Sequence, residues 1–341
     1  MKKLLNTLYV TTQKTYLRKE GETVAVEKDG QTVLRLPVHT LSGIVTFGNV
    51  LTSPYLLHMC AEKGVGVSYL SEHGRFLARV SGPVSGNVHL RMAQMRAYEN
   101  PEVKGMLARS FVIGKVMNAR NVLMRRCRDH GESDDLRVAV NALGDVLVRL
   151  RDSVPDTARI RGLEGEAAAV YFGVFNRLLT CQSTDFSIQS RNRRPPTDPM
   201  NALLSFLYTL LVHDCRSALE GVGLDPQIGF LHELRSGRPS LALDLMEEFR
   251  TVVADRIALS LVNLRQVTKR DFKVTASGAI EMKDDVRKTV LMAWQKKKQE
   301  EVSHSFTGEK VQVGLLPHLQ ALLLARHLRG DLDAYPPYLP K

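Results

Sequence analysis

Two segments of the sequence place acids and a histidine where they could bind a metal ion. Glu164 stands in RGLEGEAAAVYF (residues 161–172), and His232 and Glu247 stand in GFLHELRSGRPSLALDLMEEFR (residues 229–250). Two carboxylates and an imidazole are hard or borderline ligands, and no thiolate accompanies them. Such a set favours Mg²⁺ or Mn²⁺ over zinc.

Glu164 also has a purely structural interpretation. The residues that follow it, 167–172, are apolar or aromatic, so we expect Glu164 and Glu166 at the start of a buried helix. A carboxylate in a first turn is stabilised by the helix dipole. Position alone therefore does not make Glu164 catalytic.

Asp244 and Glu247 lie three residues apart in the run SLALDLMEEFR. This spacing places them on one face of a predicted helix, with Glu248 turned about a quarter-turn away. Acids on a mostly apolar helix often approach a cation. His232 precedes them across a turn at residues 236–239, so a helix-turn-helix would return it over the acids. A histidine between apolar neighbours is, however, more often a core or capping residue.

The composition favours a polyanionic partner. The 341 residues include 47 Lys and Arg against 36 Asp and Glu, a formal net charge of +11. Nucleic acid fits this charge best. An anionic membrane surface would fit it too, but no basic amphipathic anchor, no long apolar span and no uninterrupted signal core is present. We therefore expect a cytoplasmic protein that does not bind membranes.

The four cysteines are widely separated and lack the CxxC spacing of a zinc site or redox pair. They are Cys60, Cys127, Cys181 and Cys215. In a reducing compartment such residues are free thiols. We expect all four to be small buried apolar residues.

The pattern of the chain changes once, from β-favouring to helical. Residues 9–80 contain short β-favouring runs, among them GVGVSYL at residues 64–70, and one predicted helix at residues 53–63 that a Ser-Pro pair begins. A cluster of Gly, Pro and Ser follows at residues 82–86. The sequence therefore predicts an α+β protein, with a small β-rich N-terminal domain at residues 1–84 and a mainly α-helical catalytic domain at residues 85–341.

Within the second domain, nearly everything to residue 265 has a helical pattern. Residues 184–199 contain Arg191, Arg193 and Arg194 and are rich in proline, so they predict a basic loop and not a helix. Residues 272–282 predict a hairpin. The tail is expected to be irregular.

RGLEGEAAAVYF, NALLSFLYTLL (residues 201–211) and GFLHELRSGRPSLALDLMEEF, in this order and at these separations, closely resemble the signature segments of the CRISPR-associated integrase of the adaptation module. The resemblance covers essentially the whole chain. It implies a metal-dependent DNA endonuclease and integrase that inserts spacer DNA into a CRISPR array. The ending at residues 313–339 looks like the form that accompanies type I-C systems.

The resemblance also implies the site. It assigns catalysis and metal binding to Glu164, His232 and Glu247, with Asp244 and Glu248 in support. Many relatives carry Asp at the third position, so Glu247 and Glu248 stay alternatives there. Mg²⁺ or Mn²⁺ would polarise the scissile phosphate.

DNA contacts are expected from an aromatic residue, Tyr208, and from basic residues. Tyr208 and Arg250 match motif positions near the acids, although helix packing explains Tyr208 equally well. A basic run at residues 91–128 opposes few acids and predicts a positive surface. The remaining candidates for DNA binding are Arg125, Arg126, Arg191, Arg193 and Arg194.

The resemblance further implies a homodimer joined through the β-rich domain. It implies double-stranded and branched DNA as substrates, and a small ferredoxin-like CRISPR adaptation protein as partner. No phosphate-binding loop, nucleophile elbow or HExxH helix occurs in the sequence. Two alternatives remain open: a non-catalytic nucleic-acid-binding scaffold, and a general repair nuclease for branched DNA.

Overall fold

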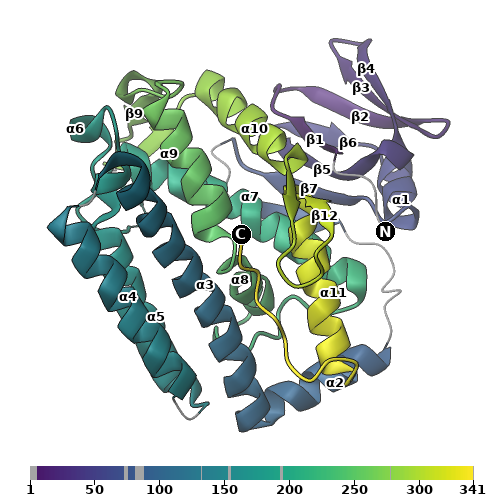
Figure 1. The fold of residues 1–341 in the computed structure, drawn as a ribbon. Helices are drawn as coiled ribbons and strands as arrows, with labels where there is room; N and C mark the ends of the chain where they lie inside the picture. The colour runs from purple at the N-terminus through teal and green to yellow at the C-terminus, as the bar shows by residue number, and fades with distance from the viewer. Residues whose placement is uncertain are drawn as a thin grey trace. The chain divides into compact units, whose positions relative to one another are not determined.

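The computed structural model describes residues 6–72, 76–80, 88–131, 133–152, 155–192, 195–276 and 278–340. The chain forms two compact units, one of Met1–Ser85 with Arg287–Gln299 and one of Gly86–Val286 with Glu300–Lys341. The boundary expected between residues 84 and 85 lies outside the described residues. Residues 287–299, assigned from sequence to the second domain, group with the first unit. Strands dominate the first unit and helices the second, which confirms the predicted α+β class (Figure 1).

Within the described residues, the first unit is built on two four-stranded sheets. One has the order β1-β5-β7-β8, in which only the last pair is antiparallel, and the other has the order β4-β3-β2-β6, in which only β2 and β6 are parallel. Its elements are β1 (Asn6–Val10), β2 (Thr15–Glu20), β3 (Thr23–Lys28), β4 (Gln31–Pro37), β5 (Leu41–Phe47), β6 (Val50–Thr52), α1 (Pro54–Glu62), β7 (Gly66–Leu70), β8 (Phe76–Val80) and most of α10 (Asp284–Gln299). The sequence predicted both α1 and the strand β7.

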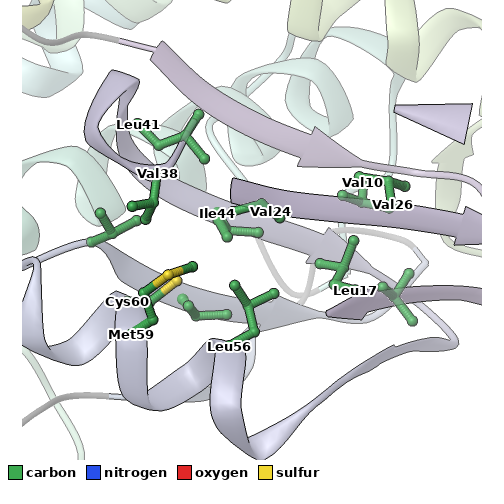
Figure 2. Close-up of a cluster of buried hydrophobic side chains, with 13 residues drawn as sticks. Val10, Leu17, Val24, Val26, Val38, Leu41, Ile44, Leu56, Met59 and Cys60 are labelled. Atoms are coloured by element: carbon green, nitrogen blue, oxygen red, sulfur yellow. The ribbon is translucent and has the colours of Figure 1, made fainter. Parts of the chain in front are cut away.

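Helix α1 begins at its Ser-Pro pair, as predicted. The Ser53 side chain accepts a hydrogen bond from the Leu56 amide at 3.2 Å, and Pro54 occupies a first-turn position that needs no N–H donor. The helix then places Leu56 and Cys60 against apolar strand residues such as Leu17 (Figure 2). Burial raises the pKa of the Cys60 thiol to about 11. This cluster is the core of the first unit.

All four cysteines are free thiols. Cys60 and Cys215 are buried as predicted, whereas Cys127 and Cys181 are half-buried, so the expectation of burial is wrong for those two. The Cys181 thiol lies 3.3 Å from the carbonyl oxygen of Val262, a hydrogen-bond partner that a purely apolar position would not need.

The second unit is mainly helical, and α3, α4 and α5 pack side by side (Figure 1). Its helices are α2 (Val88–Glu99), α3 (Pro101–His130), α4 (Asp134–Asp152), α5 (Thr157–Gly173), α6 (Ser183–Phe186), α7 (Pro199–Val222), α8 (Ser240–Met246), α9 (Arg256–Asn263) and α11 (Leu316–Leu328). Short 3-10 turns occur in the second unit at Phe175–Leu178, Lys269–Asp271 and Val313–Leu315, and in the first unit at Val38–Thr40. Among the described helices, none has the length and apolar character needed to cross a membrane.

Two short antiparallel strand pairs complete the second unit. The predicted hairpin is confirmed as β9 (Phe272–Val274) with β10 (Ile280–Met282), and β11 (Glu301–Ser303) pairs with β12 (Lys310–Gln312). The expectation that residues 184–199 contain no helix is wrong at Pro199, where α7 begins, and at their start. There Phe186 is fully buried with its ring centroid 5.8 Å from that of Phe272, and this contact anchors the turn α6. The tail at residues 331–340 is irregular, as predicted.

Helix α8 is shorter than its apolar pattern predicted. It ends at Met246, and after a turn at residues 247–249 the chain enters a π-helical segment, Arg250–Asp255, before α9. Wider π-helical turns are rare and occur often at functional sites. The two adjacent acids, Glu247 and Glu248, lie in the turn between α8 and the π-helical segment.

Candidate active site

The turn that carries His232 is fastened to α8 by the buried carboxylate of Asp244. The backbone N–H groups of residues 230–232 donate to its two oxygens, at 2.6, 3.0 and 2.9 Å in chain order. Gly229 is required at this close approach, because a Cβ there would lie 2.8 Å from an Asp244 oxygen. Residues 224–239 form turns, bends and irregular chain, so the expected helix-turn-helix is wrong, although this segment does return His232 to the acids.

The same carboxylate orients the His232 ring, whose Nδ1 lies 2.7 Å from Asp244 Oδ1. A carboxylate oxygen accepts hydrogen bonds, so Nδ1 carries the proton and Nε2 keeps its lone pair in the neutral ring. Nε2 lies 3.9 Å from Glu247 Oε1. Proteins commonly prepare a metal-binding histidine in this way. Asp244 thus acts on the site by orienting His232.

Glu164 lies in the middle of α5 and not in its first turn. The helix begins at Thr157, where the Asp156 side chain caps it by accepting from two backbone N–H groups at 3.2 and 3.1 Å. The first-turn interpretation is therefore wrong, and the helix dipole does not account for this acid. Glu164 instead forms an ion pair with Lys115 of α3. Glu166 points elsewhere and pairs with Arg149.

Glu247 is almost completely buried, with 1% of its surface exposed, and lies between two cations. Its Oε2 is 2.9 Å from Lys115 Nζ, and its Oε1 is 2.9 Å from Arg250 Nη2. Burial works to raise the pKa of Glu247, but Arg250, Lys115 and His232 outweigh burial and lower the pKa to about 2. The carboxylate is therefore charged at neutral pH and shares Lys115 with Glu164.

Glu248 points away from this cluster, into the second unit's tail. Its oxygens accept hydrogen bonds from the Tyr335 hydroxyl at 2.6 Å, the Tyr338 backbone N–H at 2.7 Å and the Gln320 amide at 2.9 Å. Burial raises the pKa of Glu248 to about 7. Of the two adjacent acids, the geometry brings only Glu247 near Glu164 and His232.

Tyr208 is buried beside the cluster, with 8% of its surface exposed. Its hydroxyl donates to Asp255 at 2.6 Å, and the Tyr171 hydroxyl donates to the other Asp255 oxygen at 3.1 Å. The guanidinium groups of Arg250 and Arg191 lie over the Tyr208 ring, 5.0 and 5.2 Å from its centroid. In this conformation the hydroxyl of Tyr208 is bound to Asp255 and its ring lies against two guanidinium groups, so most of the side chain packs within the helices.

Replacing Asp255 with Asn should change how protein stability depends on pH. Burial raises the pKa of Asp255 to about 6, against the hydrogen bonds of Tyr208 and Tyr171 and the charges of Arg250 and Arg191. A raised folded-state pKa contributes stability that is complete below the unfolded value of 3.8 and is lost as pH rises through about 6. Relative to the Asn variant, the wild type should lose up to about 3 kcal/mol between roughly pH 4 and 7.5. Urea unfolding measures this, and parallel pH curves would refute it.

The predicted DNA-binding arginines differ in their surroundings. Arg125 is exposed, while Arg126 is half-buried and donates through Nε to the Arg177 carbonyl at 2.8 Å. Arg191 donates to the Asn201 side chain at 2.6 Å, so it helps to fix its loop. The basic run is not a uniform positive surface, because its member Lys115 is buried. Arg193 and Arg194 lie outside the described residues.

The oxygen and nitrogen atoms of Glu164, Glu247 and His232 are of the kinds that bind a divalent cation, but in this conformation they do not surround one position. In the part of the chain that the structure describes, no three His, Cys, Asp or Glu side chains are close enough to hold a metal ion. The Lys115 ammonium lies between the carboxylates of Glu164 and Glu247 instead. Glu247 Oε2 is buried and has no hydrogen bond of good geometry, so the ion pair with the Lys115 ammonium 2.9 Å away is the contact that a divalent cation would replace. With His232 Nε2, these ligands suit Mg²⁺ or Mn²⁺.

The sequence did not indicate that three side chains belong to this region: Lys115, Asp255 and Tyr171. The sequence places Lys115 among the basic residues predicted to form a positive surface, because no local pattern distinguishes a buried lysine in a helical run of basic residues. Asp255 had a weak signal, an acid that follows the apolar run Val252, Val253 and Ala254. Acids in such runs seldom face water.

The sequence and the fold of this chain are similar to those of proteins of one known family. The family model described as "CRISPR associated protein Cas1" matches residues 8–296. The chain is 54% identical over 342 residues to CRISPR-associated endonuclease Cas1 1 of Chlorobaculum tepidum, with 99% of each covered. Two solved structures share its fold at a TM-score of 0.83 and 23% identity: a Cas1 protein from Thermotoga maritima, covering 97% of this chain and 99% of that one, and a casposase bound to integration product, covering 97% and 93%.

The fold defines a class of α+β proteins, with a β-rich first unit and a helical second unit, and the Thermotoga maritima structure shares this fold. In this chain the second unit also holds the buried charged cluster. The family model spans most of the chain, and the Chlorobaculum tepidum relative matches along nearly its whole length. This chain therefore belongs to the Cas1 family.

Proposed function

We propose that this chain is a divalent-metal-dependent DNA endonuclease and integrase that inserts spacer DNA into a CRISPR array in antiviral defence. The observation that carries the proposal is that Glu164 and Glu247 share the Lys115 ammonium in the helical unit, with His232 Nε2 3.9 Å from Glu247. A scaffold that only grips phosphates has no need for this convergence. The relative from Chlorobaculum tepidum bears the name of a CRISPR-associated endonuclease, which supports the same activity.

Glu164, Glu247 and His232 Nε2 would hold Mg²⁺ or Mn²⁺, which supplies Lewis-acid polarisation of the scissile phosphate and lowers the pKa of the nucleophile. Asp244 keeps His232 Nε2 turned toward Glu247. Arg250, paired with Glu247 at 2.9 Å, fixes that carboxylate.

The substrate chemistry needs no energy source. In nicking, a water oxygen attacks the phosphorus and the 3′ oxygen leaves. In joining, the 3′-hydroxyl of the incoming fragment attacks, so one phosphodiester replaces another and no ATP is consumed. This agrees with the lack of a phosphate-binding loop in the sequence.

The test uses the full chain, a plasmid that carries a CRISPR repeat, and a labelled duplex fragment. With Mn²⁺ we expect nicked plasmid and label joined to the repeat, and with EDTA we expect neither. Cleavage of branched DNA without joining would favour the general repair nuclease. DNA binding without cleavage under any metal condition would favour the non-catalytic scaffold.

We also propose the finer biological assignment that the sequence implied. The ending at residues 313–339 supports the type I-C form. The proposed partners are double-stranded and branched DNA and a small ferredoxin-like CRISPR adaptation protein. Adding that partner to the joining assay should increase insertion at the repeat, and no increase would contradict the partnership.

We propose in addition that the chain dimerises through its β-rich first unit. Exposed apolar side chains in that unit, Val33, Leu51 and Tyr55, offer surface for such an interface. A two-fold dimer would carry two sites, one for each end of a DNA fragment. Sedimentation should show a dimer at micromolar concentration and a shift toward monomer for Leu51→Arg. A wild-type monomer that DNA does not change would contradict the proposal.

A further inference from the structure

Lys115 occupies an unusual position for a lysine. It lies on α3 with 9% of its surface exposed, and its ammonium pairs with Glu164 on α5 and with Glu247, 2.9 Å away, at the end of α8. One side chain therefore joins the two carboxylates that the proposed function assigns to the metal. The helices α3 and α5 and the end of α8, which are far apart in the sequence, thus meet at the Lys115 ammonium.

The electrostatics explain why a cation is needed there. Two carboxylates at one partly buried position repel each other and lose hydration, so without a cation the cluster would be strongly unfavourable. Arg250 pairs with the other oxygen of Glu247, 2.9 Å away, and attracts Glu164 without an ion-pair contact. Lys115 is the cation that the two acids share.

A divalent ion bound to the same oxygens cannot coexist with the ammonium in this position, because both are cations and both need the same lone pairs. The bond from Lys115 to Glu247 is also incomplete, since the nearer oxygen, Oε2, accepts no hydrogen bond. Lysine is flexible, with four methylene groups and a compact charge, so its ammonium can move without movement of the helix.

The space for that movement is present. A cavity of about 20 Å³ beside Lys115 is also lined by Tyr208, Arg250 and Asp255, and it is large enough for roughly one water-sized group. The Asp255 carboxylate at this cavity gives a displaced ammonium an acceptor.

We propose that Lys115 is a built-in counter-cation of the candidate metal site, which holds Glu164 and Glu247 together before metal loading and withdraws when a divalent cation binds them. The inference rests on the proposed metal-dependent function. It makes Lys115 a positioning residue that competes with the metal, and not a ligand or a DNA-binding cation.

The test compares wild type with Lys115→Met, which keeps the apolar stem and removes the charge, and with Lys104→Met as a control on the same helix. Mn²⁺ binding is followed by the electron paramagnetic resonance signal of the free ion, and thermal unfolding is followed in EDTA. We expect Lys115→Met to bind Mn²⁺ about tenfold more tightly or better, and to unfold at a lower temperature in EDTA. Lys104→Met should match wild type in Mn²⁺ binding, and the change in unfolding temperature from its lost contact with the Tyr98 ring should be small.

These opposite changes distinguish competition from a structural role, which would lower stability and affinity together. Unchanged or weaker Mn²⁺ binding by folded Lys115→Met overturns the inference while leaving the proposed function in place. If no protein binds Mn²⁺, wild type included, the proposed function fails and the inference fails with it.

Should Lys115→Met not fold in EDTA, Lys115→Arg provides the second variant, because it retains a cation at this position. We expect it to fold and to bind Mn²⁺ no more tightly than wild type. Tighter binding by Lys115→Arg would overturn the inference.

Discussion

Alanine at Glu164, His232 or Glu247 is expected to abolish metal-dependent DNA cleavage, by at least about 10²–10³-fold. The three side chains come from α5, from the turn held by Asp244, and from the end of α8. Glu164 and Glu247 share Lys115, and His232 lies 3.9 Å from Glu247. Each would supply one ligand, and losing one of three protein ligands would leave too few donors to hold the cation. Nicking of a plasmid with Mn²⁺ measures the loss.

The controls follow from the burial of each residue. Glu164 is partly exposed, so Glu164→Ala should keep its fold, as circular dichroism would show. Both Glu247→Ala and Glu247→Gln remove the negative charge that Lys115 and Arg250 pair with. Glu247→Gln keeps the shape of the buried side chain and one acceptor oxygen, so it is the better variant there. Glu166→Ala is the matched control, because Glu166 lies on the same helix but pairs with Arg149. Full activity in folded Glu164→Ala would remove the catalytic assignment.

The fold class followed from local patterns in the sequence. The Ser-Pro start of α1, the strand β7 and the hairpin of β9 and β10 each depend on residues that are neighbours along the chain. Local turn chemistry and hydrophobic period determine such elements with little help from distant contacts. They could therefore be predicted without knowledge of the rest of the chain.

The site depended on distant contacts, and here local patterns were insufficient. Glu247 and Glu248 are neighbours in sequence, yet one lies beside Lys115 of α3 and the other beside Tyr335 of the tail. The spacing of three residues between Asp244 and Glu247 predicted one helical face, but α8 ends at Met246. The burial of Lys115 likewise requires Glu164 and Glu247, which no local pattern connects to it.

DNA affinity should fall steeply as salt rises, with a shallower slope when Arg125 is changed to Glu. The acidic ligands of the proposed metal position repel the DNA phosphates, so nearby cations must hold the phosphates there. The net charge of +11 shows that the chain has cations in excess. Binding should be to the DNA backbone, because captured fragments vary in sequence. Removing one cation that pairs with a phosphate reduces the slope of log affinity against log salt by about 1.

Arg125 and Arg126 were predicted together, but the structure makes Arg125 the cleaner probe. Arg125 is exposed, whereas Arg126 donates to the Arg177 carbonyl at 2.8 Å, so its reversal would also disturb packing. Lys28→Glu, an exposed charge reversal at the end of β3 in the first unit, serves as the matched control for net charge. Fluorescence anisotropy of a labelled duplex over a series of salt concentrations gives the slopes. A flat wild-type dependence, or equal slopes for Arg125→Glu and Lys28→Glu, would show that the surface around Arg125 does not bind the DNA backbone.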